Sequence, residues 1–149
     1  MYEKILITLD GSSLAESALP HAEAIARQFG GELTLLQVVP SPVTIAVGYY
    51  DHLSGEVLEA LRDTALEQAK VYVEEQVAAV TGRGIKASGQ VVEGEPVDCV
   101  LHCADELVVD LVVMATHGRS GLGRWVFGSV ADRVLRGAER PVLLIRARE

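Results

Sequence analysis

The sequence predicts an α/β protein built on a doubly wound, five-stranded parallel sheet of order 3-2-1-4-5, with helices on both faces. Short, almost wholly apolar runs alternate with longer segments whose apolar residues recur at helical spacing. That β-α-β-α-β-α-β-α-β alternation is typical of parallel sheets with right-handed crossovers. The composition, 49% hydrophobic but only 5% aromatic, favours a core of Val, Leu, Ile and Ala, as in buried parallel sheets.

The first strand and helix are bounded by clear local signals. Residues 4–9 form an apolar run, as expected of a central strand covered on both faces. Ser13 and Glu16 have the spacing of a capping box, so we expect a helix to begin there. Pro20 lies inside that helix and predicts a kink or an irregular second turn. Gly30 predicts its end.

The middle of the chain holds two further strands and a long helix. Residues 32–39 form the second expected strand, which ends before Pro40. A loop from Pro40 to Gly55 follows, longer than is usual in a compact domain. Apolar residues from Leu58 onward then predict a long helix that ends near Gly82. Residues 85–92 form the third expected strand.

The last part of the chain carries the remaining elements. Pro96 opens a third helix near its first turn. The fourth strand is expected from Asp110 to Met114, and a glycine-rich loop from Thr116 to Phe127. Ser129 begins the fourth helix, and Pro141 to Arg146 forms the final strand.

Size and charge limit the classes of function. The 149 residues fit one domain, residues 1–149, because no linker or repeat interrupts the pattern. The formal net charge of −8 disfavours general binding to nucleic acid or to anionic lipid. No signal-like or bilayer-length apolar run is present, which predicts a soluble cytoplasmic protein. Cys99 and Cys103 lack the C-x-x-C spacing and are interpreted as reduced helix cysteines.

The predicted strand order places two polar turns together. In doubly wound sheets a ligand binds at the carboxyl ends of the strands where the order reverses, here between the first and fourth strands. Asp10, directly after the first strand, is a candidate ligand contact at this point, or it is simply part of a strand-to-helix turn. Gly128 and Ser129 stand at a helix start, where free N–H groups favour an anion.

The segment between the fourth strand and the last helix is rich in groups that could donate hydrogen bonds to a phosphate. From Thr116 to Ser129 it has two arginines, one histidine and no carboxylate. Its glycines, Gly118, Gly121, Gly123 and Gly128, allow the backbone to approach a ligand closely. The chain has neither the Walker pattern nor a G-x-G-x-x-G after its first strand, so neither of those phosphate loops is indicated.

Five segments, in this order along the chain, resemble the universal stress protein family over essentially the whole length. They are residues 5–12 (ILITLDGS), 35–38 (LLQV), 94–96 (GEP), 110–129 and 140–145 (RPVLLI). The ATP-binding branch of that family carries G-x2-G-x9-G-[ST] after its fourth strand. The corresponding positions here are Ala115, Gly118, Gly128 and Ser129, so alanine replaces the first glycine.

The resemblance implies ATP, with Mg²⁺, as the ligand. By position, the family's adenine and ribose contacts fall on Thr8, Asp10 and Val38. Its phosphate contacts fall on Gly118, Gly128, Ser129 and Val130, and the site is further lined by Met114, Ala115, His117, Arg119 and Gly121. Asp10 and Ser129 are the candidates for a metal contact. The family also implies a homodimer joined through the last strand, from Val142 to Ile145.

Three functions remain open at this point. The first is a binding module in which ATP occupancy controls partner choice during stress, with slow hydrolysis at most. The second is an ATPase that uses His117 and Asp10, although the sequence favours a structural or ligand-lining role for His117 over a catalytic one. The third is a nucleotide-free dimer. Arg119 either contacts phosphate or is a solvated loop charge.

Overall fold

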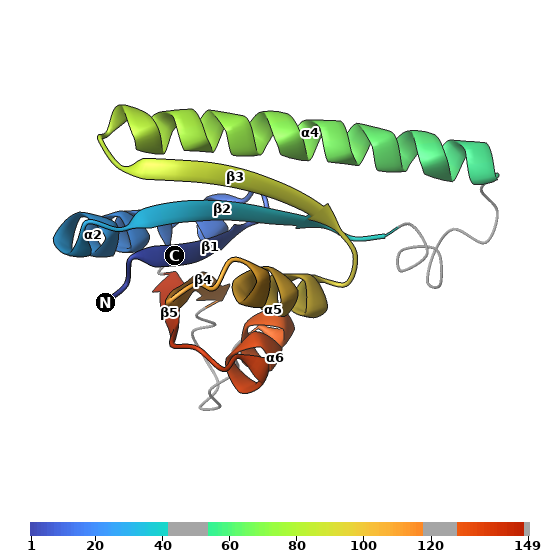
Figure 1. Cartoon of the computed structure of the whole chain (residues 1–149). Coiled ribbons are helices and arrows are strands. Elements are labelled where there is room, and N and C mark those ends of the chain that lie inside the picture. Colours follow the sequence, from blue (N-terminus) through green and yellow to red (C-terminus); the bar gives the residue numbers. More distant parts are fainter. Residues whose placement is uncertain (42–53, 118–127, 148–149) are drawn as a thin grey trace.

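The protein is a five-stranded parallel sheet between two layers of helices (Figure 1). The structure, a computed structural model, describes residues 1–41, 54–117 and 128–147. The strand order is β3-β2-β1-β4-β5 and every neighbouring pair is parallel, which confirms the predicted 3-2-1-4-5 arrangement. The strands are β1 (Lys4–Leu9), β2 (Glu32–Val39), β3 (Lys86–Glu93), β4 (Leu111–His117) and β5 (Val142–Ala147).

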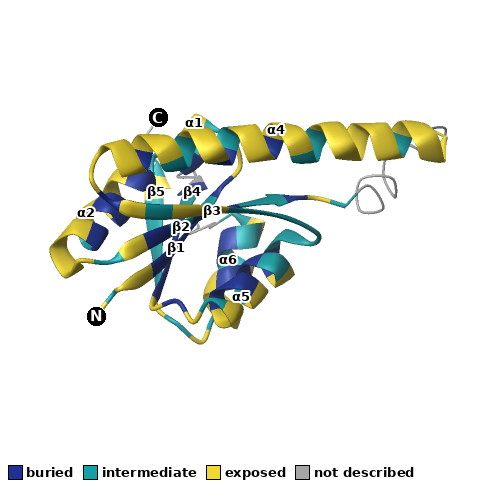
Figure 2. Ribbon diagram, turned by 45° about the horizontal axis from the view of Figure 1, so that its top comes forward, coloured by how far each residue is buried: buried dark blue, intermediate teal, exposed yellow. Residues whose placement is uncertain are grey.

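Two helical layers cover the two faces of the sheet. The helices are α1 (Ser13–Glu16), α2 (Leu19–Phe29), α4 (Gly55–Gly82), α5 (Pro96–Glu106) and α6 (Ser129–Gly137). Helices α1, α2 and α4 pack on one face in a cluster with Ile5 and Ile7, and α5 and α6 pack on the other face with Leu6. Because side chains alternate along a strand, β1 contributes to both clusters, and most of it is dark blue in Figure 2.

The helix predicted from Ser13 to Gly30 is divided into two. The cap is Ser12, not Ser13: the Ser12 Oγ accepts the N–H of Ala15 at 3.1 Å. The prediction of a Ser13 capping box was therefore wrong by one residue. An irregular turn separates α1 from α2, and Pro20 lies at the start of α2, where its missing N–H removes no helical hydrogen bond. The interruption expected at Pro20 is confirmed.

The predicted end of the fourth strand changes because pairing with β5 extends β4. The fourth strand was expected to end at Met114, but β4 continues to His117. Ala115, Thr116 and His117 pair with Ile145, Arg146 and Ala147 of β5. The predicted loop therefore begins after His117 rather than at Thr116. Of the predicted loop between Pro40 and Gly55, residues 42–53 lie outside the described residues.

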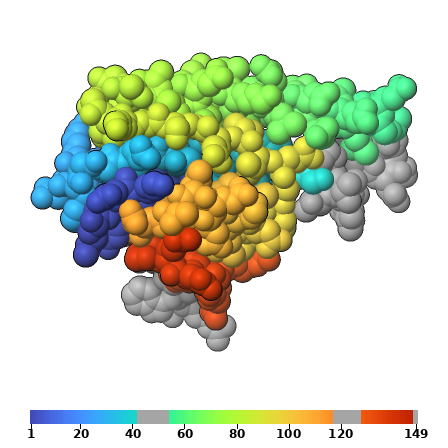
Figure 3. Space-filling model, in the orientation of Figure 1, coloured from blue at the N-terminus to red at the C-terminus, as the bar shows by residue number. Residues whose placement is uncertain are grey.

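The long helix α4 runs over β3 and extends past the carboxyl end of that strand (Figures 1 and 3). Its C-terminal half packs on the sheet through Ala69, Val73 and Val80, whereas its first turns are largely exposed. Arg62 in the extended half donates from Nε to Glu93 at 2.6 Å, which ties this part of the helix to the end of β3. The helix therefore forms one wall above the carboxyl ends of the strands.

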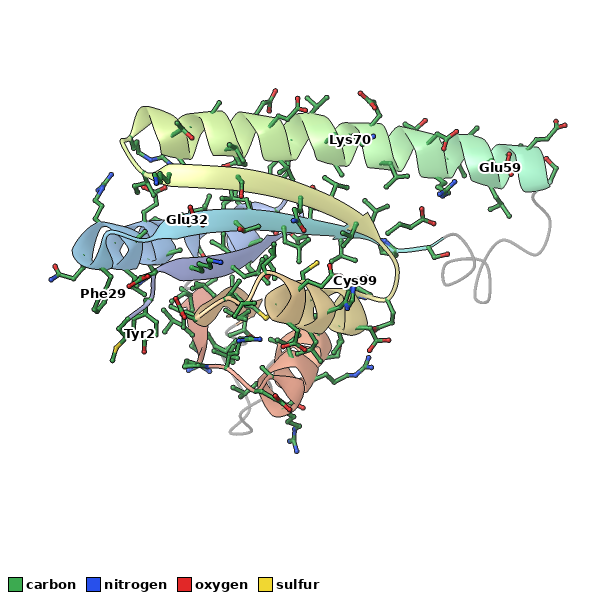
Figure 4. All side chains as sticks on the ribbon, in the orientation of Figure 1. Tyr2, Phe29, Glu32, Glu59, Lys70 and Cys99 are labelled. Carbon is green, nitrogen blue, oxygen red and sulfur yellow. The ribbon has the colours of Figure 1, made fainter. Side chains whose placement is uncertain are left out.

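The cysteines and the N-terminal aromatic residues are structural (Figure 4). Cys103 is buried, Cys99 is half-buried, and both are free thiols, as predicted. Burial raises the pKa of each thiol, which opposes thiolate chemistry. Tyr2 and Phe29 meet edge to face, with ring centroids 5.3 Å apart.

Within the described ranges, no helix is both long enough and apolar enough to cross a bilayer.

Candidate functional site

The sheet opens between β1 and β4 at the carboxyl ends of these strands. Their pairing ends at Ile7 and Val113, whereas β4 continues to pair with β5 as far as His117. Beyond this point the two strands separate. A cavity of about 760 Å³ lies at this opening, within the usual size range of small-molecule sites. Its position is the one predicted for the reversal of strand order.

The predicted site residues that the structure describes with their side chains all line this one cavity. They come from the ends of β1, β2 and β4 and from the start of α6, and they are Thr8, Asp10, Val38, Met114, Ala115, Gly128, Ser129 and Val130. Segments more than a hundred residues apart in sequence are thus brought together. Of the others, His117 is the last residue of β4, and Gly118, Arg119 and Gly121 lie outside the described residues.

Asp10 is held by the turn between β1 and α1. Its Oδ1 accepts hydrogen bonds from the backbone N–H of Ser12, at 2.9 Å, and from the Ser12 hydroxyl. Gly11 has a φ of 83°, a left-handed conformation that glycine adopts without strain. Within the part of the chain that the structure describes, no hydrogen bond reaches the Asp10 Oδ2. One carboxylate oxygen therefore fixes the turn, and the other is available to a ligand at an exposed position.

Among the described residues, no side chain caps the start of α6, which lies at the cavity. Helices α1, α4 and α5 are capped by the side chains of Ser12, Ser54 and Glu95. The N-cap of α6 is Gly128, which has no side chain to accept a hydrogen bond from the first turn. Since the first N–H groups of a helix have no partner within it, they favour an anion at this end. Ser129, at the first helical position, is exposed and adds a hydroxyl group.

Ala115 fits its position without strain. It is a half-buried residue inside β4, paired with Ile145. The non-glycine residues with positive φ in the described structure are Tyr2 and Val108, so the backbone at Ala115 does not need glycine. The replacement of the first glycine of the family pattern therefore costs no backbone strain here.

Two helices that the sequence did not connect with the site also line the cavity, α4 from one face of the sheet and α5 from the other. Their lining residues, unpredicted from sequence, are Ala65, Gln68, Ala69 and Tyr72 of α4 and Pro96 and Val100 of α5. The Tyr72 hydroxyl donates to Glu16 of α1 at 2.9 Å. Burial, together with the hydrogen bond to Glu16, raises the pKa of Tyr72, so this phenol stays protonated. A pattern of apolar helix residues indicates burial but not the particular cavity that the residues line.

The cavity combines apolar walls with polar groups at the strand ends and the helix start. Such a site suits a ligand with a flat apolar part, hydroxyl groups and an anionic end. In the described residues no three His, Cys, Asp or Glu side chains gather as a metal site.

Comparisons with known proteins agree in family and fold. The model of the universal stress protein family matches residues 1–146. A curated relative, universal stress protein MJ0531 of Methanocaldococcus jannaschii, is 35% identical over 149 residues, covering 98% of this chain and 83% of its own length.

Among solved structures, that of hypothetical protein MJ0577 has a TM-score of 0.81 at 29% identity and covers 100% of this chain and 99% of its own. A universal stress protein in complex with cAMP has a TM-score of 0.64 at 23% identity, with 97% of each chain covered. At that identity the likeness to the cAMP complex concerns the fold alone.

Proposed function

Because the chain belongs to the universal stress protein family, we propose that it binds ATP in the cavity between β1 and β4. The observation that carries the proposal is the joint presence, in one cavity, of the Asp10 Oδ2, which no described residue binds, and the start of α6, which no described side chain caps. The first suits ribose hydroxyls and the second suits phosphates. The same fold holds cAMP in one solved structure, although that likeness concerns the fold alone.

The bound nucleotide lies with its base near Val38, its ribose at Thr8 and Asp10, and its phosphates at Gly128 and Ser129. Met114 and Ala115 form the floor between these ends. The phosphates also meet Val130 and the segment that contains His117, Gly118, Arg119 and Gly121. A magnesium ion bound with ATP takes phosphate oxygens, waters and one or two protein groups, for which Asp10 and Ser129 are the candidates.

ATP acts here as an effector rather than a rapidly turned-over substrate. Efficient phosphoryl transfer needs a positioned base and metal ligands in addition to cations. Occupancy by ATP then sets the conformation or the partner choice of a cytoplasmic stress-response module. A phosphate-release assay separates this role from that of an ATPase: bound ATP that survives incubation supports the binding module, and rapid multiple turnover supports the enzyme.

ATP with Mg²⁺ is expected to raise the melting temperature of the protein. A ligand that binds only the native state stabilises it by about 2.7 kcal/mol at a hundred times its dissociation constant. AMP should raise the melting temperature less than ATP does, because AMP lacks the outer phosphates. Differential scanning fluorimetry measures both, and mass spectrometry of ligand released from the purified protein identifies what is bound. No shift with millimolar ATP would refute nucleotide binding.

We also propose a homodimer formed through β5. This strand lies at the edge of the sheet, and Val142 to Ile145 are all partly exposed. An edge strand leaves backbone groups unpaired, and a two-fold partner strand would cover both these groups and the apolar side chains.

Leu144→Pro is expected to convert the dimer to a monomer, because proline removes one donor from the middle of the pairing segment. Val142→Lys tests the same interface by placing like charges near the two-fold axis. Light scattering over a concentration series measures the mass of each variant, and circular dichroism checks that it is folded. A wild-type monomer at high micromolar concentration would exclude the dimer. A folded Leu144→Pro variant that remains dimeric would place the interface elsewhere.

A further inference from the structure

A single side-chain hydrogen bond joins the end of β4 to the start of α6. The Thr116 Oγ1 accepts the backbone N–H of Gly128 at 3.2 Å. Thr116 is only 5% exposed, so its hydroxyl occupies a fixed, largely water-free position. Both residues line the cavity. The contact therefore sets the distance between the last part of the strand and the first residue of the helix.

Thr116 binds the N-cap residue of α6 through that residue's own N–H group. Gly128 lacks a side chain, and the first helical hydrogen bond of α6 runs from Asp132 N to the Gly128 carbonyl at 2.9 Å. The N–H of Gly128 itself is bound by Thr116, whereas those of Ser129 and Val130 lie in the uncapped first turn at the cavity. Fixing Gly128 consequently fixes the direction in which these next two N–H groups point.

Glycine at position 128 is not required by the backbone. Its φ is −53°, which any residue adopts, and a Cβ atom built there would meet no heavy atom within 4 Å. Gly128 itself lines the cavity. A side chain would fill this space and cap the helix internally, whereas glycine combined with Thr116 keeps the helix start both anchored and accessible.

We propose that Thr116 is the positioning residue for the phosphate end of the site: its hydroxyl holds the start of α6 so that the N–H groups of Ser129 and Val130 meet the phosphates. This inference rests on the proposed binding of ATP. It assigns Thr116 to the phosphate end only. Substitution of Thr116 should therefore lower the affinity for ligands that carry phosphates and not for ligands that lack them.

The test compares Thr116→Val, which keeps the shape of the side chain and removes the acceptor, with Thr116→Ser, which retains the hydroxyl. Titration calorimetry measures the affinity for ATP with Mg²⁺ and for adenosine. Thr116→Val is expected to lower the affinity for ATP about tenfold, since misplaced N–H groups lose charge-assisted hydrogen bonds to the phosphates. The affinity for adenosine should stay within about twofold of the wild-type value. Thr116→Ser should restore most of the ATP affinity.

Thr34→Val is the matched control. Thr34 is a half-buried β2 residue whose hydroxyl lies 3.4 Å from that of Ser88, and it does not line the cavity. The same chemical change there should leave the affinities for both ligands unchanged. An equal loss of ATP and adenosine affinity in Thr116→Val would indicate general damage and overturn the proposal, as would unchanged ATP affinity.

A second measurement needs no ligand. Amide hydrogen exchange in the unliganded protein should show faster exchange at Gly128 in Thr116→Val, but not in Thr116→Ser. Unchanged protection at Gly128 would overturn the anchoring role itself. A wild-type protein that binds neither ATP nor adenosine would instead refute the proposed function, and with it the role of Thr116 in ligand binding, while the exchange experiment still decides whether Thr116 anchors α6.

Discussion

Asp10→Asn is expected to weaken the binding of ATP and of adenosine alike, by about tenfold each. The asparagine Oδ1 can still accept the two hydrogen bonds from Ser12, so the turn after β1 is preserved. The second carboxylate oxygen is replaced by an amide NH₂, which cannot accept a proton from a ribose hydroxyl, and the charge is lost. Titration calorimetry on both ligands measures the loss.

The comparison of ligands makes this prediction specific. Asp10→Asn should reduce the preference for ATP over 2′-deoxy-ATP, because the ribose hydroxyl is the group that its carboxylate recognises. Ser129→Ala should lower the affinity for ATP by about tenfold, because a hydroxyl that donates a hydrogen bond to a phosphate is lost. The affinity for adenosine should stay nearly unchanged. If the folded Asp10→Asn variant binds both ligands as the wild type does, the ribose lies elsewhere in the cavity.

Gly89→Ala is expected to destabilise the protein by about 1–3 kcal/mol, the usual range for overpacking a well-filled core. Gly89 lies in β3 directly beneath α4. A Cβ atom at this position would overlap the Cγ1 of Val73 and stand 3.1 Å from the Cγ2 of Val77. Val73 is 3% exposed and stiff at χ1, so it cannot turn away without disturbing the helix. Urea unfolding measures the change in the free energy of unfolding.

Two further variants decide whether the close contact is the cause. Gly82→Ala is the matched control, since a Cβ atom there would meet nothing within 4 Å and alanine favours a helix. Its free energy of unfolding should stay the same or rise. Val73→Ala should lower the free energy of unfolding less in the Gly89→Ala background than in the wild type, because it relieves the overlap with the new Cβ atom. Additive losses in the double mutant would contradict this account.

The parallel sheet was predictable because its strands are marked by composition. Residues 4–9 and 32–39 were expected as strands, and β1 and β2 have those bounds. A strand covered on both faces is largely apolar, so its boundaries appear directly in the sequence. Where polar residues continue a strand, as at Thr116 and His117, composition does not reveal the end of the strand. Pairing with β5 determines where β4 ends.

The choice between Ser12 and Ser13 as the cap of α1 shows a second limit. Both serines are chemically able to cap a helix, and the capping-box spacing favours Ser13. The left-handed Gly11 and the hydrogen bonds from Ser12 to Asp10 set the direction in which the chain leaves β1, and this geometry makes Ser12 the cap. Local propensity alone does not distinguish neighbouring residues of the same type.

The sequence by itself determined the order and spacing of the strands and, through its family resemblance, which residues to consider as a site. Those properties depend on local composition and on motifs that are contiguous in the chain. Only the tertiary structure decided that β1 and β4 separate after Ile7 and Val113, that Tyr72 of α4 lines the same cavity, and that Thr116 holds Gly128. Each of these features depends on how whole helices and strands pack rather than on any local pattern.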